Sequence, residues 1–251
     1  MTRRLFALIG MLAAMAWPIA AHGDITTYTQ DFEGLNQGAA NALANDGWFV
    51  YANVFGPGGN YLYGYGTFSA PNGGSGFSSI AGGPAQGGQY LNVYSDYNNV
   101  SEHNAGNYVD ALVFQERTIG ATNVGVGKSF SFAFDYLKNG GASGVDGNAR
   151  TFAFVKVLDP LNGYATLGIT EFETTGASAT AWTSQTLNLA ANNPAWNGKL
   201  LQFGFRSYAT NFNRTGRFYD NLNFSSVPEP SSVGLISLGL AGLGFRRRRD
   251  G

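Results

Sequence analysis

The side chains of this chain that can carry out acid–base or metal chemistry are almost all carboxylates. The 251 residues contain no cysteine and only two histidines, His22 and His103. Since His22 lies in the apolar amino-terminal segment, a Ser-His-Asp arrangement or a histidine-based zinc site would depend on His103 alone. This residue lies in a turn-rich stretch, 101–106, where we expect its ring to be solvated. The sequence therefore disfavours histidine-dependent catalysis.

Paired carboxylates are the remaining catalytic route, because two of them at a suitable separation hydrolyse glycosides. Glu171 and Glu173 alternate on one face of an expected strand, and Asp110 and Glu116 bracket another. Any acidic β-protein offers such pairs by chance. We therefore predict a protein that is not an enzyme, with a glycoside hydrolase as the less favoured alternative.

Two segments concentrate the aromatic rings, amides and carboxylates that bind sugars. In each, side chains two apart would share one face of a strand. The predicted ligand-binding residues are Tyr61, Tyr63 and Tyr65 in the first segment and Asn92, Tyr94, Asp96 and Asn98 in the second. The alternatives are that the tyrosines belong to the core and that the second segment is a strand running into an Asp/Asn turn.

Short strands joined by turns must position these residues. The chain has 36 glycines and few charges, a composition typical of β-sandwiches and barrels. Strict alternation in residues 128–136 predicts a strand with Phe130, Phe132, Phe134 and Tyr136 in the core. Further strands are expected at 25–33, 48–55, 60–65, 89–95, 109–119, 151–157, 164–172, 182–189, 201–206 and 217–224. We expect one helical turn within 36–44 and long loops over 56–88. The predicted fold class is all-β, an antiparallel β-sandwich.

The length and charge of the central part limit its function. Residues 24–226 suit one larger domain. They carry 14 acidic residues, the whole chain's 16 less Glu229 and Asp250, against 9 basic ones, the 15 less six terminal arginines. Nucleic acid is excluded as an expected partner, because phosphate binding needs a basic patch. Without cysteine, stability must come from the core or from bound ions.

The amino-terminal residues 1–23 have the order of a secretory signal peptide. Arg3 and Arg4 precede an apolar stretch from Leu5 to Ala16, and small residues follow. Cleavage by signal peptidase fits after Ala21 or Gly23. The mature chain is then expected to begin near residue 24 and to be exported.

The carboxyl-terminal residues 227–251 form a second targeting segment. A short motif, an uncharged apolar run over 231–245 and an arginine cluster follow one another: Val227, Pro228, Glu229, Pro230, then Arg246, Arg247, Arg248 and Arg249. Basic residues stay on the cytoplasmic side. As a helix the apolar run would be about 23 Å long against roughly 30 Å of hydrocarbon. We expect a marginal transmembrane helix that inserts transiently.

This tail resembles the PEP-CTERM sorting signal of Gram-negative bacteria. The resemblance implies recognition by an exosortase, a membrane cysteine protease-transpeptidase, at an inner-membrane intermediate. It also implies removal of the tail and delivery to the cell surface or extracellular matrix. A plain single-span anchor is the alternative.

A second resemblance covers most of residues 28–224. The segments 30–34, 130–135 and 218–222 are arranged like the first, central and last strands of jelly-roll carbohydrate-binding modules with a galactose-binding-like fold. The resemblance implies that the first and last strands lie together and share a structural calcium, with Glu33 and Asp220 as ligands and Asp31 as a less favoured third. Calcium takes 6–8 oxygen ligands, which such strands can supply.

The placement of Asp220 supports an ion independently of that resemblance. Strict alternation places Asp220 on one strand face with Phe218, Leu222 and Phe224, where an unpaired carboxylate is costly. A hydrogen-bonded aspartate at a sheet edge is the alternative. The expected function is that of a surface or matrix protein whose jelly roll binds extracellular polysaccharide or another matrix component. A purely structural matrix or adhesion protein is the alternative.

Overall fold

The computed structural model describes residues 25–36, 39, 41–69, 77–78, 85–96, 100–138, 148–211, 213 and 215–228. The predicted signal peptide, the apolar run with its flanking Glu229, Pro230 and arginines, and Asn98 lie outside these residues. Within them, no helix is both long enough and apolar enough to cross a bilayer.

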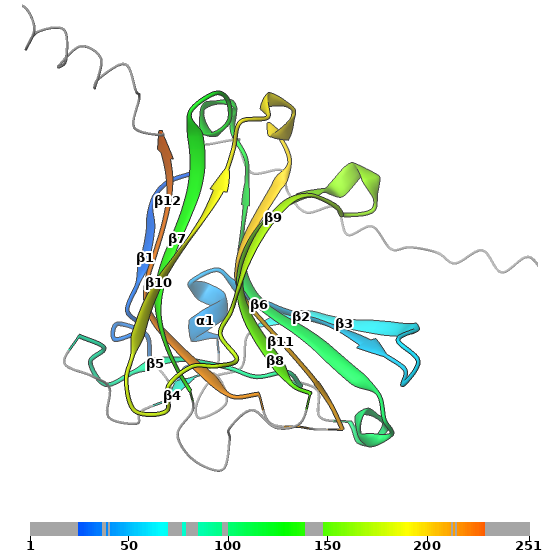
Figure 1. Ribbon diagram of the computed structural model, residues 1–251. Coiled ribbons are helices and arrows are strands. Elements are labelled where there is room, and N and C mark those ends of the chain that lie inside the picture. Colours follow the sequence, from blue (N-terminus) through cyan, green and yellow to red (C-terminus); the bar gives the residue numbers. More distant parts are fainter. Residues whose placement is uncertain are drawn as a thin grey trace, which may run out of the picture.

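Two antiparallel sheets pack face to face as a sandwich (Figure 1), which confirms the predicted fold class. Sheet A has the order β10 (Thr183–Ala190), β7 (Lys128–Lys138), β12 (Arg217–Pro228), β5 (Tyr90–Val93) and β4 (Phe77–Ser78), with β1 (Tyr28–Gln30) also paired to β12. Sheet B has the order β3 (Tyr61–Ser69), β2 (Trp48–Phe55), β6 (Tyr108–Thr118), β11 (Leu200–Thr210), β8 (Arg150–Asp159) and β9 (Ala165–Glu173).

Short helical turns complete the described chain. Helix α1 (Ala42–Asn45) precedes β2, and the 3₁₀ turns are η2 (Ser101–Asn104), η3 (Ala121–Asn123), η4 (Pro160–Asn162) and η5 (Pro194–Trp196). All the strands expected from alternation are present, and β4 is added within the segment expected to be loop. The pairing of β1 with β12 confirms that the first and last strands lie together.

The core lies between the sheets and is rich in aromatic rings. Phe130, Phe132 and Phe134 are at most 1% exposed, as their alternation predicts. Phe132 contacts rings of the opposite sheet, with its centroid 5.3 Å from that of Phe203 and 5.6 Å from that of Phe205. Full burial of such a side chain contributes roughly 1.5–3 kcal/mol. These contacts hold the two sheets in one alignment.

A β-bulge in β12 changes which side chains face the core. The pairing with β7 shifts between Asp220 and Asn223, and Asn221 takes a left-handed φ of 49°. Tyr219 and Leu222 therefore both belong to the central core, whereas Asp220 lies opposite Asp135 of β7. The predicted placement of Asp220 on one face with Leu222 and Phe224 is wrong, because strict alternation fails across a bulge.

Candidate functional site

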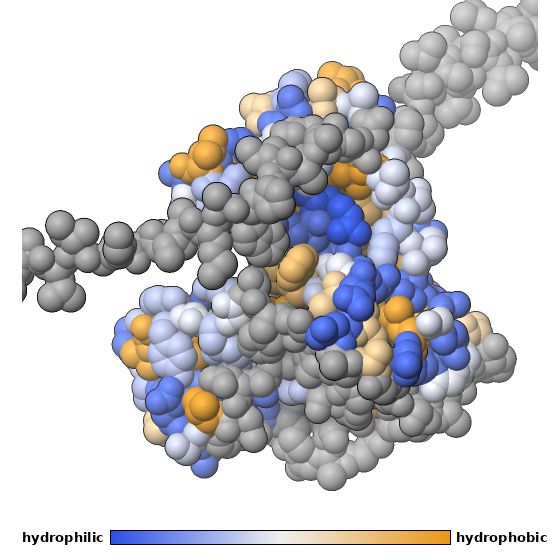
Figure 2. All heavy atoms as spheres, turned by 180° about the vertical axis from the view of Figure 1, so that it is seen from behind, coloured by the Kyte–Doolittle hydropathy of each residue, from blue (hydrophilic) through white to orange (hydrophobic). Residues whose placement is uncertain are grey.

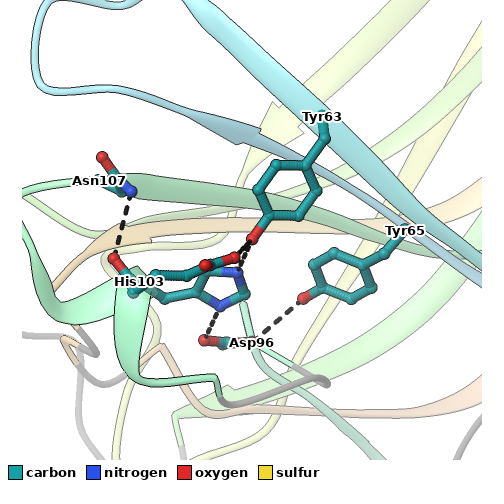
Figure 3. A network of polar contacts seen from close by, with 6 residues as sticks. Tyr63, Tyr65, Asp96, His103 and Asn107 are labelled. Atoms are coloured by element: carbon teal, nitrogen blue, oxygen red, sulfur yellow. Dashed lines mark hydrogen bonds and ion pairs between the residues drawn. The ribbon is translucent and has the colours of Figure 1, made fainter.

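Two of the predicted tyrosines form a closed polar network with a histidine (Figure 3). His103, in η2, places Nδ1 2.6 Å from Oδ2 of Asp96 and Nε2 2.8 Å from the hydroxyl of Tyr63. Tyr63 also donates to the carboxylate of Glu102, and Tyr65 donates to Asp96 over 3.1 Å. We call these five residues the histidine network.

His103 lies buried at the centre of the histidine network, and both of its ring nitrogens have partners within the network. His103 is 1% exposed and stacks on the ring of Tyr65 at 5.8 Å, so the expectation that its ring is solvated is wrong. Burial, together with the carboxylates of Glu102 and Asp96, raises the pKa of Tyr63 to about 12. A phenol held protonated in this way is a hydrogen-bond donor and a poor nucleophile. The network holds β3 against the segment that follows β5.

The structure separates the first predicted tyrosine from the other two. Tyr63 and Tyr65 pack against an apolar cluster that includes Ala52 and Val54. The pairing of β2 with β3 shifts register between Val54 and the next residue of β2, so the side chain of Tyr61 points to the opposite face of the sheet from Tyr63. Tyr61 is 58% exposed. The three tyrosines therefore do not form one platform, although each lies on β3 as predicted.

The second predicted segment is a strand only at its start. β5 ends at Val93, so Asn92 is in the strand, while Tyr94 and Asp96 lie beyond it and are partly buried. Asp96 belongs to the histidine network. The structure thus brings Tyr63, Tyr65 and Asp96 together, whereas Tyr61 lies elsewhere.

The outer face of sheet B, turned away from sheet A, carries a row of aromatic rings that crosses five strands. Each ring neighbours the next, with centroid distances of 5.8, 4.6, 6.5 and 6.2 Å. The row, which we call the aromatic row, consists in order of Tyr61 (β3), Phe55 (β2), Tyr108 (β6), Tyr208 (β11) and Phe152 (β8). All five side chains are at least partly exposed.

An arginine lies beside the aromatic row and holds two carboxylates. Arg206 donates to both oxygens of Asp110, over 2.8 and 2.9 Å, and to Glu171 over 3.4 Å. Its guanidinium also lies 5.6 Å from the ring centroid of Phe152 and 5.7 Å from that of Tyr208. The bidentate pair fixes the guanidinium plane. The row is therefore flanked by oriented donors and acceptors, a combination suited to a hydroxyl-rich ligand.

The same face continues along β8 and β6 with Lys156 and Glu116, which both lie opposite Gln202 of β11. Burial lowers the pKa of Lys156 to about 8 and raises the pKa of Glu116 above its ordinary value. Lys156 lies over the ring of Phe154, 4.8 Å from its centroid, and Gln202 donates to Glu116 over 2.7 Å. Amines and carboxyls half-removed from water in this way make stronger polar contacts with a ligand than exposed ones.

The structure shows where the two carboxylate pairs that could hydrolyse glycosides lie. Asp110 and Glu116 are six residues apart on β6, roughly 20 Å along the strand, beyond the 10 Å or so that hydrolysis requires. Glu171 and Glu173 contact different arginines, Arg206 and Arg150. The first pair therefore cannot act together on one glycosidic bond.

Asp220, the central residue of the proposed calcium site, lies near enough to Asp31 and Glu33 to feel their charges. Its side chain is fully buried, and its Oδ2 has no hydrogen-bond partner. Burial raises the pKa of Asp220 to about 7, and Asp135, Asp31 and Glu33 add to the rise through their charges. Glu33 accepts hydrogen bonds from the backbone N–H groups of residues 88 and 89.

The residues near Asp220 meet some, but not all, of the requirements of a cation-binding site. The unpaired oxygen of Asp220 and the repulsion among nearby carboxylates would both be relieved by positive charge. Over the described part of the chain, however, no three histidine, aspartate or glutamate side chains are close enough to make a ready metal centre. Backbone carbonyls or water would have to complete the coordination.

Of the five rings in the aromatic row, only Tyr61 was predicted as a ligand-binding residue. Phe55, Tyr108, Phe152 and Tyr208 each alternate with a core residue, so their outward direction could be read from the pattern. Their adjacency depends on the order β3-β2-β6-β11-β8, in which strands distant in sequence are neighbours. Alternation alone does not give that order.

Comparison with solved structures found distant similarity. A cyclase from Fischerella sp. TAU is 11% identical, over 82% of this chain and 100% of that chain, with a TM-score of 0.42. A carbohydrate-binding module of the β-sandwich superfamily is 14% identical, over 78% and 63%, with a TM-score of 0.35. A family 61 carbohydrate-binding module in complex with β-1,4-galactotriose is 16% identical, over 62% and 84%, with a TM-score of 0.33.

Comparison with protein families addresses the tail. No curated protein matches the chain. Residues 226–249 match the PEP-CTERM protein-sorting motif, in agreement with the three-part pattern at the end of the sequence. The chain is thus an exported protein that carries a PEP-CTERM motif for sorting by an exosortase.

Proposed function

We propose that the β-sandwich domain, delivered to the cell surface or extracellular matrix of a Gram-negative bacterium, binds polysaccharide along the aromatic row. The row carries this proposal, because partly exposed rings on five neighbouring strands offer a continuous stacking surface. The faces of sugar rings stack on aromatic rings, and their hydroxyls need oriented donors and acceptors. Arg206, Asp110 and Glu171 supply those at the edge of the row.

The charges of this face favour a neutral polysaccharide. Arg206 and Lys156 are surrounded by the carboxylates of Asp110, Glu116 and Glu171. Both cations are therefore compensated before any ligand arrives. A strongly anionic chain would meet carboxylates already in place, and like charges brought together weaken binding.

Processing precedes this activity. Signal peptidase would remove residues 1–23, and the exosortase would remove the tail after transient insertion in the inner membrane. A plain membrane anchor would leave the same domain tethered. The proposed sugar binding applies to either form.

We further propose a structural calcium ion at Asp220, with Glu33 as second carboxylate ligand and Asp31 as a weaker third. Without calcium, the raised pKa of Asp220 means that the folded state binds more protons than the unfolded state between about pH 4 and pH 7. The free energy of unfolding should then fall as pH rises through this window, by a few kcal/mol at most, since one pKa unit corresponds to about 1.4 kcal/mol.

Urea unfolding of the wild type and of Asp220→Asn at several pH values tests the calcium proposal. We expect the fall in the wild type to be absent in the variant and to be removed by calcium in the wild type only. Equal stability of the chelated and calcium-loaded wild type at pH 7 would exclude the ion.

A glycan array probed with the full chain in detergent tests sugar binding. We expect saturable binding to neutral polysaccharides. Absence of binding to every glycan would favour a purely structural matrix protein. Release of reducing sugar from a bound polysaccharide would favour the glycoside hydrolase instead.

A further inference from the structure

One end of the sandwich lies where the chain enters its sorting motif. β12 ends at Pro228, which pairs with Lys128 at the start of β7. The matched motif begins at residue 226, so the last residues of the fold are also the first of the membrane-directed segment. While the apolar run is inserted in the membrane, this end of the domain must be close to the bilayer.

Strand pairing identifies the loops that share this end. Lys128 begins β7 here, and the end of β10 pairs beside it, Ala190 with Ser129. The ends of β6 and β8 both pair with the start of β11 at Leu200. The loops 119–127, 160–164 and 191–199 therefore lie at the end where β12 leaves the fold (Figure 1). We call them the tail-end loops.

The tail-end loops carry the three most exposed large apolar side chains among the described residues. Val126 is 97% exposed, Leu161 is 91% exposed and Tyr164 is 61% exposed. Figure 2 shows hydrophobic side chains at the tips that project at the top of the molecule. Isolated exposed apolar residues are common, but the most exposed ones here gather at the end where β12 leaves the fold.

Local structure holds two of these side chains outward. Val126 sits in a tight turn between two glycines with positive φ, at 126° and 74°. The backbone N–H of Leu161 is bonded to Asp159, and Tyr164 takes a left-handed φ of 59°. The turns therefore hold the side chains of Val126 and Leu161 outward, and neither needs to rearrange to contact a surface.

The charge of this end also fits a lipid surface. The loops and the strand residues that border them contain three charged side chains, Lys128, Lys199 and Asp159. Asp159 is paired with Lys199 over 2.7 Å. Among the described residues of these loops and their borders, an anionic bilayer therefore meets no unpaired carboxylate, although the domain as a whole is acidic. Cationic groups near such a surface favour association.

We propose that the tail-end loops rest on the membrane while the tail is inserted, with Val126 and Leu161 entering the lipid headgroup region. Apolar side chains of interfacial segments reach roughly 5–10 Å into the boundary between headgroups and acyl chains. This contact orients the domain before the exosortase acts. It also directs the aromatic row, which crosses β6 at its opposite end, away from the membrane.

Leu62 provides a matched control at that opposite end. It is 44% exposed and lies on β3 next to Tyr61, which pairs with the end of β2. The end of β2 in turn pairs with Tyr108 at the start of β6. The eleven residues of β6 span roughly 35 Å at about 3.3 Å each. A probe at residue 62 should therefore stay far from the bilayer.

Single-cysteine labelling of the full chain tests the proposal without ambiguity, because the natural sequence has no cysteine. Val126→Cys, Leu161→Cys and Leu62→Cys are each labelled with an environment-sensitive fluorophore. The labelled proteins are reconstituted in vesicles of phosphatidylethanolamine and phosphatidylglycerol. Emission is compared with and without doxyl-labelled lipid.

The expected result is a blue shift and quenching by doxyl lipid at positions 126 and 161, and neither effect at 62. Leu161→Asp should also reduce the blue shift of the label at 126. Labels at 126 and 161 as solvated as the one at 62 would overturn the proposal. So would equal quenching at all three sites, or a blue shift that appears only when exosortase is added. None of these outcomes depends on sugar binding.

Discussion

The histidine network and the aromatic row are both built from tyrosines and carboxylates, yet they are suited to opposite purposes. In the network, both nitrogens of the buried His103 are bonded to neighbouring side chains. In the row, the rings are partly exposed, and an arginine fixes polar groups at their edge. Polar groups satisfied within the protein stabilise it, whereas rings open to solvent can bind a ligand. Residue type alone does not separate the two regions.

Truncating the buried histidine should give the largest effect on stability. His103→Ala leaves the carboxylate of Asp96 and the hydroxyl of Tyr63 without their shared partner. Removing one member of a buried pair costs about 3–5 kcal/mol, and we expect a loss near 3 kcal/mol because Asp96 is slightly exposed. Chemical denaturation measures this loss. Glycan affinity of the folded variant should be unchanged, and a loss of affinity would place the network in the binding site.

Lys156, on the outer face of sheet B, should make the stability of the protein depend on pH. The pKa of Lys156 is lowered to about 8, so between about pH 8 and pH 10 the unfolded state binds more protons than the folded state. Stability should therefore rise with pH in this window, by about 1–2 kcal/mol. Lys156→Met should remove the rise, which urea unfolding at several pH values can detect. A rise of equal size in the variant would refute the assignment.

Removing the hydroxyl of Tyr63 or of Tyr61, two tyrosines on one strand, should give the smallest effects on stability, and the two effects should differ. Tyr63→Phe removes a hydroxyl that is bonded to the buried His103 and to Glu102, and it should cost about 1 kcal/mol, the net value of a typical hydrogen bond. Tyr61→Phe changes an exposed ring and should leave stability within about 0.5 kcal/mol. Thermal unfolding of the pair provides the test. Equal losses would mean that Tyr61 and Tyr63 have equivalent environments.

Much of the fold was predictable because residues that face the core alternate strictly with residues that face outward along the core strands. Phe130, Phe132 and Phe134 occupy the core as their spacing predicts. The failures have local physical causes. A bulge at Asn221 reverses the direction of Asp220 relative to Leu222, and such insertions leave no clear mark in the pattern.

The candidate site was less predictable than the fold. Tyr61 was identified, but its neighbours in the row come from strands far apart in the sequence. His103 was expected in solvent because its segment is rich in turn residues, whereas the aromatic rings of Tyr63 and Tyr65 cover it. The neighbours of Tyr61 and the burial of His103 both depend on which strands lie side by side in the sheets. The pattern within a single strand does not determine that order.

We propose that the aromatic row, and not the histidine network, binds polysaccharide. Isothermal titration of a polysaccharide identified on the array, into the wild type and into the double variant Tyr108→Ala/Tyr208→Ala, distinguishes the two regions. We predict a loss of at least about 1.4 kcal/mol, a tenfold weaker affinity, with the secondary structure of the variant retained by circular dichroism. Unchanged affinity in the folded double variant would show that the aromatic row does not bind the polysaccharide.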